Sequence, residues 1–288
     1  MIGREDRAIA APFQAERAPA PFQRRALTVT AAEELGAYRM LRVADPHGPM
    51  PAAGQFAMLA AVERWGGGED ERPYLARALS FAGWRDGEAA FLLEDVGPGT
   101  RRLCEMRPGD SVWMLGPLGA CFTAPDEGRR SLLAGGGIGI APLALWQHAL
   151  GSRALALLGF RDGPHAQGAS LFSDARIATD DGSAGHHGNV ADLLREELDR
   201  DGHAKVYACG PPAMLEAVRA LCAARSTPAQ LALEAGMACG FGACFGCVVP
   251  KRGGGYLRVC VDGPVVDAAE LESVEAHTGT PAPAGASA

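Results

Sequence analysis

The stretch that decides how the C-terminal part of this chain folds reads Met237-Ala238-Cys239-Gly240-Phe241-Gly242-Ala243-Cys244-Phe245-Gly246-Cys247. Together with Cys260, its cysteines have the spacing C-x4-C-x2-C-x12-C, which is typical of plant-type [2Fe–2S] clusters. The glycines between them let a loop wrap closely around a small inorganic core, because glycine tolerates positive φ. We therefore predict a [2Fe–2S] cluster and, with it, one-electron transfer. The predicted ligands are Cys239, Cys244, Cys247 and Cys260.

Two other interpretations of the cysteines stay open at this point. Structural zinc usually takes two close pairs of ligands, and only Cys244 and Cys247 form a CxxC pair. The cysteines could also be structural thiols or disulfides. However, four of the eight cysteines in this chain of 288 residues fall in one ligand pattern, which favours a reducing cytosol over a secreted disulfide framework. We therefore expect a cytoplasmic protein.

The composition excludes some classes of function. The net charge of −7 argues against nucleic-acid binding. No apolar run reaches the roughly 18 residues that a membrane span needs. The N-terminus has charges at residues 4–7 and no apolar stretch after them, so we expect no secretory signal. Partners are therefore sought among proteins and small molecules.

The pattern of residues predicts three folded parts between two disordered ends. Short strands broken by Gly, Pro and Asp turns predict an antiparallel β-barrel over residues 26–127. Apolar runs alternate with helical stretches over 128–228, which predicts an α/β domain with a parallel sheet. Residues 229–268 form a small cluster domain, which at that size needs a metal or another staple to fold. We expect disorder in residues 1–25 and in most of 269–288.

The expected elements can be placed by residue number. Barrel strands are expected at 26–30, 38–43, 55–62, 76–82, 89–96 and 111–115. In the α/β part we expect strands at 131–134, 153–159 and 205–209, and helices at 142–150, 190–200 and 212–225.

A glycine-rich turn joins the expected strand 131–134 to the helix after it. Such a turn lets a pyrophosphate approach the backbone and the helix N-terminus. A tight structural turn is the alternative explanation. The acidic residue that usually ends the next strand of a dinucleotide-binding fold is missing, and Arg161 stands there. Arg161 could attract a 2′-phosphate, so NAD and NADP both stay open. The candidate residues of the turn are Gly135, Gly136, Gly137, Ile138 and Gly139.

The strand 205–209 ends in a second candidate segment, Cys209-Gly210-Pro211. A strand end followed by a helix start is a ligand-binding edge in an α/β sheet. Cys209 could line a nicotinamide pocket, or it could be a buried apolar thiol.

Two further candidates lie in the barrel part. Arg77 and Ser80 share one expected strand, yet residues three apart face opposite sides. The pair must therefore work around a bend, or Ser80 must contribute its backbone; an ordinary surface strand is the alternative. Gly99 and Thr100 precede an expected helix over 101–106, where Thr100 as N-cap would mark a phosphate site.

Taken in order, these motifs resemble the electron-transfer subunits of class 1B dihydroorotate dehydrogenase, in the ferredoxin–NADP reductase superfamily. The resemblance covers about residues 26–268. It is most specific in the cysteine loop, with Glu234 and Met237 before it, and in Gly116-Pro117-Leu118-Gly119. The remaining motifs are residues 77–80, 97–100, 135–143, 181–183 and 209–211.

The resemblance implies an FAD-binding β-barrel, an NAD-binding α/β domain and a [2Fe–2S] domain. It implies that electrons pass from an FMN-containing catalytic subunit through the cluster and FAD to NAD⁺, in pyrimidine biosynthesis and within a heterotetramer. It names no general base. The implied FAD contacts are Arg77, Ala78, Leu79, Ser80, Leu92, Leu93, Glu94, Gly99 and Thr100. The implied NAD contacts are Gly135–Gly139 and Cys209, Gly210 and Pro211.

The chain departs from the family pattern at four positions. Ala78 replaces a proline, Leu93 a tyrosine, Glu94 an arginine and Ala232 a serine. Because an acid beside flavin phosphates is unfavourable, Glu94 is expected to point away or to meet Arg77 or Arg101. Two alternatives remain on the residues alone. One is a related reductase subunit that serves ferredoxin, a sulfide-linked partner or a hydrogenase; the other is a non-enzymatic redox sensor or structural zinc protein.

Overall fold

The computed structural model of the chain describes residues 24–66 and 73–274. The disorder expected at residues 1–23 and 275–288 lies outside the described residues. The last described residues are packed rather than loose, since Leu271 and Val274 are buried. Within the described ranges no helix is long and apolar enough to cross a membrane.

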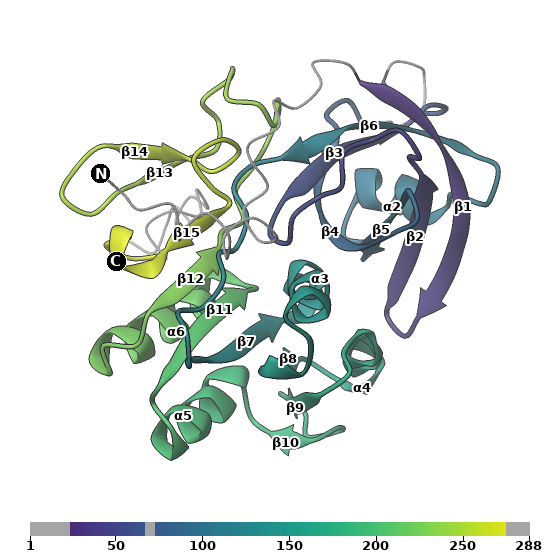
Figure 1. The fold of residues 1–288 in the computed structure, drawn as a ribbon. Coiled ribbons are helices and arrows are strands. Elements are labelled where there is room, and N and C mark those ends of the chain that lie inside the picture. The colour runs from purple at the N-terminus through teal and green to yellow at the C-terminus, as the bar shows by residue number, and fades with distance from the viewer. Residues whose placement is uncertain (1–23, 67–72, 275–288) are drawn as a thin grey trace, which may run out of the picture.

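The N-terminal part is a closed antiparallel barrel, as predicted (Figure 1). Its strands follow the spatial order β1-β2-β5-β4-β3-β6. The short helix α2 (Pro98–Cys104) follows β5, and Leu103 of this helix is buried in the barrel core with Met106 just beyond it. The strands are β1 (Arg25–Leu35), β2 (Tyr38–Ala44), β3 (Phe56–Ala61), β4 (Arg77–Arg85), β5 (Glu88–Leu93) and β6 (Ser111–Leu118).

The middle part is the predicted parallel α/β sheet, with seven strands in the order β10-β9-β8-β7-β11-β12-β15. Only β15 runs antiparallel to its neighbour. The strands are β7 (Arg130–Gly136), β8 (Ala154–Phe160), β9 (Ala175–Thr179), β10 (His186–His187), β11 (Ala204–Cys209), β12 (Ala229–Ala232) and β15 (Val265–Asp267). The helices are α3 (Ile140–Leu150), α4 (Gly163–Ala166), α5 (Val190–Arg200) and α6 (Pro212–Ala224).

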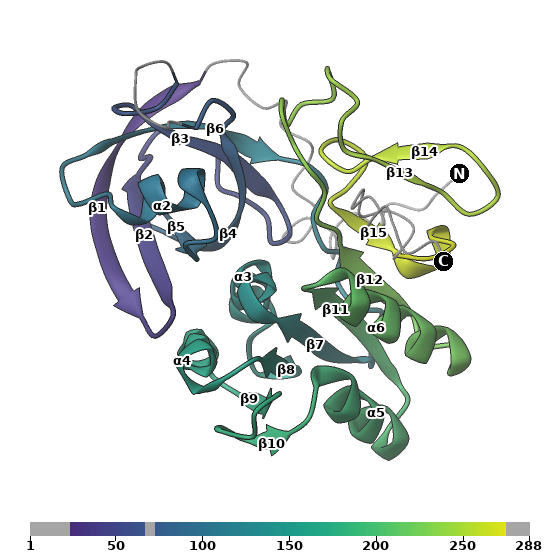
Figure 2. The same cartoon turned by 180° about the vertical axis from the view of Figure 1, so that it is seen from behind.

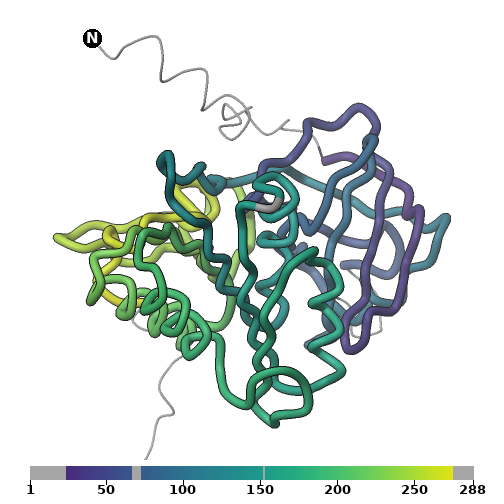
Figure 3. Tube along the Cα trace, turned by 60° about the horizontal axis from the view of Figure 1, so that its bottom comes forward, coloured from purple at the N-terminus to yellow at the C-terminus, as the bar shows by residue number. Residues whose placement is uncertain are grey.

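Helix α3 lies between the sheet and the barrel, while α5 and α6 lie on the other side of the sheet (Figure 2). The contact is apolar: Leu143 and Trp146 of α3 share a core with Met40 and Leu92 of the barrel. Figure 3 shows the barrel as a lobe beside the rest of the chain. This packing brings the end of β5 close to the ends of β7 and β8.

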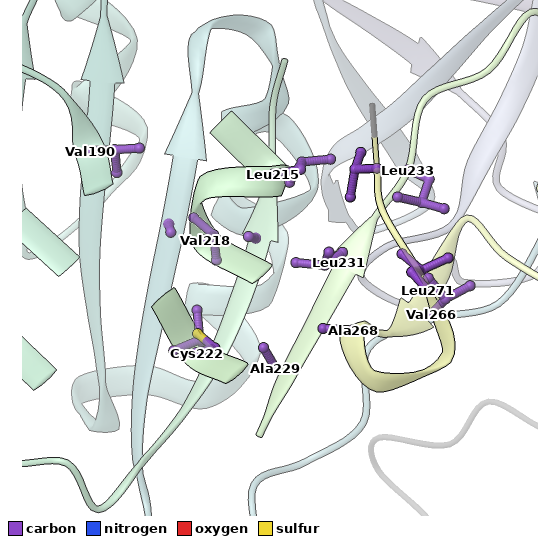
Figure 4. Close-up of a cluster of buried hydrophobic side chains, with 14 of the residues drawn as sticks. Val190, Leu215, Val218, Cys222, Ala229, Leu231, Leu233, Val266, Ala268 and Leu271 are labelled. Carbon is purple, nitrogen blue, oxygen red and sulfur yellow. The ribbon is translucent and has the colours of Figure 1, made fainter. Parts of the chain in front are cut away.

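The cluster segment is continuous with the α/β sheet. Strands β12 and β15 extend that sheet. Between them in the sequence come the cysteine loop and a small hairpin, formed by β13 (Val248–Pro250) and β14 (Tyr256–Arg258). Leu231 and Val266 on these strands share one core with Val218 and Cys222 of α6 (Figure 4). The predicted boundary between 228 and 229 therefore falls inside a continuous sheet, and the segment borrows its core from the neighbouring domain.

Candidate functional site

Two cavities adjoin where the barrel meets the sheet. The larger, of about 480 Å³, lies at the carboxyl ends of β7, β8 and β11. The smaller, of about 250 Å³, lies between the barrel and α3. Both are lined by the same four residues, Glu94, Ile138, Gly139 and Glu234. Ligands in the two cavities would therefore contact the same four residues from their two sides.

The glycine turn forms one wall of the larger cavity. Gly136–Gly139 line it together with Gly210 and Pro211, six of the residues predicted for NAD. Gly139 is required by close packing, because a Cβ there would come within 2.6 Å of the Cys209 backbone. Gly135 does not line the cavity; a Cβ at that position would crowd the Leu143 and Leu158 side chains at 3.1 and 3.2 Å. The glycines of this turn therefore allow close packing and also line the cavity.

The larger cavity offers groups that fit a dinucleotide. The first turn of α3 carries no acidic residue, so its backbone N–H groups favour a phosphate. Tyr38 of the barrel also lines this cavity, and its hydroxyl is buried with no hydrogen-bond partner among the described residues. Burial raises the pKa of this hydroxyl, so it stays a donor at neutral pH. Buried polar groups normally have a partner, which a ligand would supply.

The smaller cavity collects most of the residues predicted for FAD. Ala78, Leu79, Ser80, Leu92, Glu94 and Thr100 line it. Leu93 lines neither cavity, because its side chain is fully buried in the barrel core. Cys209 also lines this cavity, on the side of α3, and burial raises the pKa of its thiol well above the ordinary value. Cys209 is thus both a buried thiol and a cavity residue.

The side chains of Arg77 and Ser80 serve different places next to β4. Ser80 faces the cavity, while the Arg77 side chain extends to the first turn of α2. Gly99 makes room for it, because a Cβ on Gly99 would overlap the guanidinium of Arg77. The Arg77 guanidinium and the N–H groups at the start of α2 are thus close together with no side chain between them. Such an arrangement fits a diphosphate.

Thr100 does not cap α2, and this part of the prediction is wrong. The helix begins at Pro98 with Gly97 as its N-cap, which puts Thr100 inside the first turn. There its hydroxyl accepts a hydrogen bond from the Val96 N–H at 3.0 Å and donates one to the Gly97 carbonyl at 3.1 Å. Thr100 therefore fixes the shape of the first turn of α2, which contains Gly99.

Glu94 meets neither Arg77 nor Arg101, so the expected partners are wrong. Its carboxylate lies 2.9 Å from Arg161 Nη2, across the boundary between the barrel and the α/β domain. Arg101 pairs with Asp95 instead, at 3.1 Å. The reason is the packing of the domains, because the end of β5 faces the end of β8 and brings Glu94 within reach of Arg161. The sequence contains no signal for a pair 67 residues apart.

Two other cavity residues were not among the predicted site residues. His165 of α4 lines the larger cavity, and the edge of its ring packs on Tyr38 with the ring centroids 5.3 Å apart. Glu234 follows β12 and lines both cavities; the surrounding protein raises the pKa of its carboxyl. Glu234 stands out in the sequence only as the acid before the cysteine loop.

The four predicted cluster ligands form two pairs of neighbouring thiols. Cys239 is hydrogen-bonded to Cys244, and Cys247 to Cys260. The described residues hold no group of three or more His, Cys, Asp or Glu side chains arranged around one metal ion. Pairs of thiols suit a core of two irons, each of which takes two thiolates.

Backbone N–H groups surround these sulfurs. Burial acts to raise the pKa of the Cys239 thiol, but hydrogen bonds from the Phe241, Ala243 and Cys244 backbone outweigh burial and lower it to about 6. The Cys260 N–H points at Cys247 Sγ at 3.4 Å. Metal-binding thiols must be thiolates, so the lining of Cys239 fits a cluster ligand. At Cys260, in contrast, burial and the neighbouring Cys247 raise the pKa of the thiol to about 12.

The cluster loop joins the smaller cavity to the molecular surface. Met237 lines that cavity, and Cys239 follows two residues later. The loop packs on the barrel, because a Cβ at Gly240 would lie 2.5 Å from the Met58 side chain. In Figure 1 this yellow-green loop rises beside β3 and β6. On its outer side Phe241 and Phe245 are 52% and 60% exposed, next to the exposed Cys244.

Comparison with known proteins gives consistent results. Residues 234–272 match the family model of the iron-sulfur cluster binding domain of dihydroorotate dehydrogenase B. The chain is 39% identical over 212 residues to the dihydroorotate dehydrogenase B (NAD(+)) electron transfer subunit of Bacillus caldolyticus, covering 69% of this chain and 80% of that one. It is 38% identical over 240 residues to the protein of the same name in Geobacillus thermodenitrificans, covering 77% and 87%.

Solved structures show the same fold. The structure of NADH-dependent reduced ferredoxin-NADP oxidoreductase superposes with a TM-score of 0.74 at 23% identity and covers 87% of this chain and 91% of that one. A ferredoxin NADP⁺ reductase from Neisseria gonorrhoeae, solved with FAD and NADP, gives a TM-score of 0.54 at 15% identity and covers 70% and 91%.

Proposed function

Because this chain belongs to the family of dihydroorotate dehydrogenase B (NAD(+)) electron transfer subunits, we propose that it carries electrons from a dihydroorotate-oxidising catalytic subunit through a [2Fe–2S] cluster and FAD to NAD⁺. Dihydroorotate loses two electrons and two protons to become orotate. NAD⁺ takes both electrons and one proton as hydride, and the second proton leaves to water. The reaction belongs to pyrimidine biosynthesis.

One observation carries the proposal best: the segment after β12 lines the smaller cavity with Leu233, Glu234 and Met237 and then reaches the cluster ligand Cys239. The same cavity shares a wall with the larger one. This succession supports three neighbouring sites for electron carriers. When bound, FAD supplies the exchange between single electrons and hydride.

The residues of this chain position the carriers. Arg77 and the α2 start hold a diphosphate, and Ser80 and Leu92 line the cavity beside it. The glycine turn and the α3 N-terminus hold the pyrophosphate of NAD⁺. Ile138 and Gly139 form part of the shared wall against which the two ligands meet. None of these roles requires a general base.

We propose further that the partner is an FMN-containing catalytic subunit, in a heterotetramer of two subunits of each kind. The exposed phenylalanines Phe241 and Phe245 beside Cys244 support this, because exposed aromatic side chains are enriched in protein interfaces. Arg258 stacks over Phe245 at 5.4 Å and holds its ring in place. We also propose a cytoplasmic location, which the free cluster thiols support.

Reconstitution tests this function. We expect the anaerobically purified chain to contain flavin, iron and sulfide, and to form NADH from dihydroorotate when it is mixed with the FMN-containing subunit of the same organism. The substitution Phe245→Ser should weaken association with that subunit by about tenfold while flavin and iron contents stay unchanged. Met50→Ser, at another exposed apolar position, in the connection between β2 and β3, should leave association unchanged.

Other results would contradict the proposal. A colourless, zinc-loaded protein would support the structural-zinc alternative. A flavin and iron–sulfur protein that reduces ferredoxin with NAD(P)H, but forms no orotate with any FMN-containing subunit, would identify a related reductase subunit instead.

A further inference from the structure

One arginine joins the cysteine loop to the hairpin that follows it. Arg258 ends β14, where it pairs with Val248, the residue after the predicted ligand Cys247. Its backbone N–H and its Nε donate hydrogen bonds to the same carboxylate oxygen, Asp262 Oδ2, at 2.9 and 3.4 Å. Its carbonyl accepts a hydrogen bond from the Asp262 N–H at 2.8 Å. Arg258 is therefore fixed at the base of the turn that carries Cys260.

The guanidinium of Arg258 lies against the cysteine loop. Its central carbon is 5.4 Å from the centre of the Phe245 ring. A Cβ added at Gly242 would come within 3.3 Å of Arg258 Nη1. The Gly242 N–H in turn donates a hydrogen bond to the Cys260 sulfur. The Arg258 side chain is 35% exposed, so the protein shields most of it from water.

The other charges of this segment lie elsewhere. The stretch 235–261 contains no acidic residue, and its basic residues are Lys251, Arg252 and Arg258. Lys251 and Arg252 lie in the turn between β13 and β14, at the end of the hairpin away from the cysteines. Lys251 also pairs with Glu270 at 2.7 Å. Arg258 is therefore the cation that the hairpin places beside the cysteine loop.

Asp262 anchors the guanidinium without cancelling its charge at the loop. The carboxylate binds the Nε side, whereas Nη1 is the nitrogen nearest to Gly242. The three atoms closest to the Cβ position of Gly242 are Val261 Cγ2, Arg258 Nη1 and Arg258 Cζ, and no Asp262 atom is among them. The ion pair thus presents its positive end to the loop.

A fixed charge beside a [2Fe–2S] cluster affects how readily the cluster is reduced. Two irons held by four thiolates form an anion, and reduction adds one electron while no bond forms or breaks. A nearby cation stabilises the more negative state, most strongly where the protein shields it from water.

We propose that Arg258 is a positioning residue that raises the reduction potential of the cluster, with Asp262 as its anchor. The electron comes from the catalytic subunit and leaves to FAD, and Arg258 stabilises the state in between. The inference rests on the proposed function, because it assumes that the four cysteines hold this cluster.

A redox titration of the anaerobically purified chain, followed by electron paramagnetic resonance, tests this. We expect Arg258→Met to lower the equilibrium constant for one-electron reduction by about tenfold, which corresponds to a potential about 59 mV more negative. Arg258→Lys keeps the charge and should restore most of the potential. Asp262→Asn should shift the potential in the opposite direction, because the amide still accepts the Arg258 N–H but no longer offsets the guanidinium.

The matched control is Arg252→Met, which removes the same charge at the hairpin turn and should leave the potential unchanged. Iron content and g values report whether each variant holds an intact cluster, since a loosened loop would alter them whereas a lost charge shifts the potential alone. An intact Arg258→Met with the wild-type potential, or a shift as large in Arg252→Met, overturns the inference.

The anchor variant decides the case in which Arg258→Met loses its iron. An intact Asp262→Asn whose potential does not rise then overturns the inference, and a rise supports it. If the wild-type chain shows no [2Fe–2S] signal after reduction, the proposed function fails and the inference fails with it.

Discussion

Gly99 shows how a missing side chain can serve a site. The Arg77 guanidinium occupies the space over the start of α2 that a Cβ at this position would need. Gly97, two residues earlier in the same turn, has open space around it and an extended φ of 163° that other residues also adopt. The two glycines therefore form a matched pair for testing the FAD cradle.

We expect Gly99→Ala to displace Arg77 and to weaken FAD binding by about tenfold, the value of one charge-assisted contact. Since the displaced group is the end of a flexible side chain, the melting temperature of the flavin-free protein should stay unchanged. Gly97→Ala should bind FAD as the wild type does. Flavin titration followed by fluorescence measures both affinities. Equal affinities of the two variants would remove Arg77 from the diphosphate site.

Individual site residues differ in how far the sequence reveals them. The cysteines could be proposed as ligands because cluster ligands lie close together in the chain and keep a fixed spacing. Ser80 and the glycine turn could be proposed as cofactor contacts because local motifs carry them. The pair of Glu94 and Arg161 could not, because it depends on how two domains pack and no local pattern records that packing. The sequence showed only that Glu94 is an acid where the family pattern has an arginine.

At the scale of elements, one carboxylate ties three of them together. Glu197 of α5 is fully buried, and hydrogen bonds of 2.9 and 2.7 Å link it to Arg130 of β7 and Arg176 of β9. Burial acts to raise its pKa, but the hydrogen bonds from these arginines outweigh burial and hold the pKa below its ordinary value of 4.5. A lowered pKa means that this group stabilises the fold above about pH 4.5 and that the contribution is lost as the pH falls through the lowered value.

Glu197→Gln should therefore lower the free energy of unfolding at pH 7 by about 3 kcal/mol, since it leaves arginines without their buried partner. The loss should shrink as the pH falls below 4.5. The neighbouring Glu196 is half exposed and pairs with the same Arg176. Glu196→Gln should cost less than about 1 kcal/mol at any pH. Urea unfolding across the pH range measures both; a loss that persists at acidic pH would mean that packing, rather than charge, explains the effect.

Long elements with regular apolar spacing were predicted well, and short ones were not. Helix α5 occupies the residues expected, and its capping box at Asn189 and Asp192 gives a local start signal. Strands β9 and β10 were missed because they are short and contain charged or histidine residues. The hairpin β13–β14 was missed because its strands are three residues each and the turn between them is glycine-rich. Such short strands are stabilised by hydrogen bonds to neighbouring strands, which the local sequence does not indicate.

On the scale of the whole molecule, the cluster segment shares its sheet and core with the α/β domain. From the sequence we predicted a small cluster domain that needs a metal or another staple to fold. No local pattern in the sequence indicates that β12 and β15 join the sheet of the neighbouring domain. The core of this segment is supplied by α6, through Val218 and Cys222. We therefore expect the cluster to order the cysteine loop and the hairpin, while apolar packing holds the sheet.

Two cysteine substitutions separate these roles. Cys244→Ser should lose the iron and the iron–sulfur absorption, yet retain cooperative unfolding; trypsin should then cleave at Arg258 or Lys251. Cys222→Ser should keep the iron and lower the free energy of unfolding by about 1–3 kcal/mol, because it buries a hydroxyl in the apolar core. Iron assay, circular dichroism and limited proteolysis measure these outcomes. Global unfolding of Cys244→Ser would show that the metal holds the sheet as well.

The wall of Glu94, Ile138, Gly139 and Glu234 that both cavities share has a thermodynamic consequence. Two ligands that bear on the same four residues have linked affinities, and linkage is reciprocal: the factor by which flavin changes the affinity for the nucleotide equals the factor by which the nucleotide changes the affinity for flavin. A substitution in this wall is therefore expected to change the coupling between flavin and nucleotide binding. To describe that change, the affinity for each ligand must be measured with and without the other.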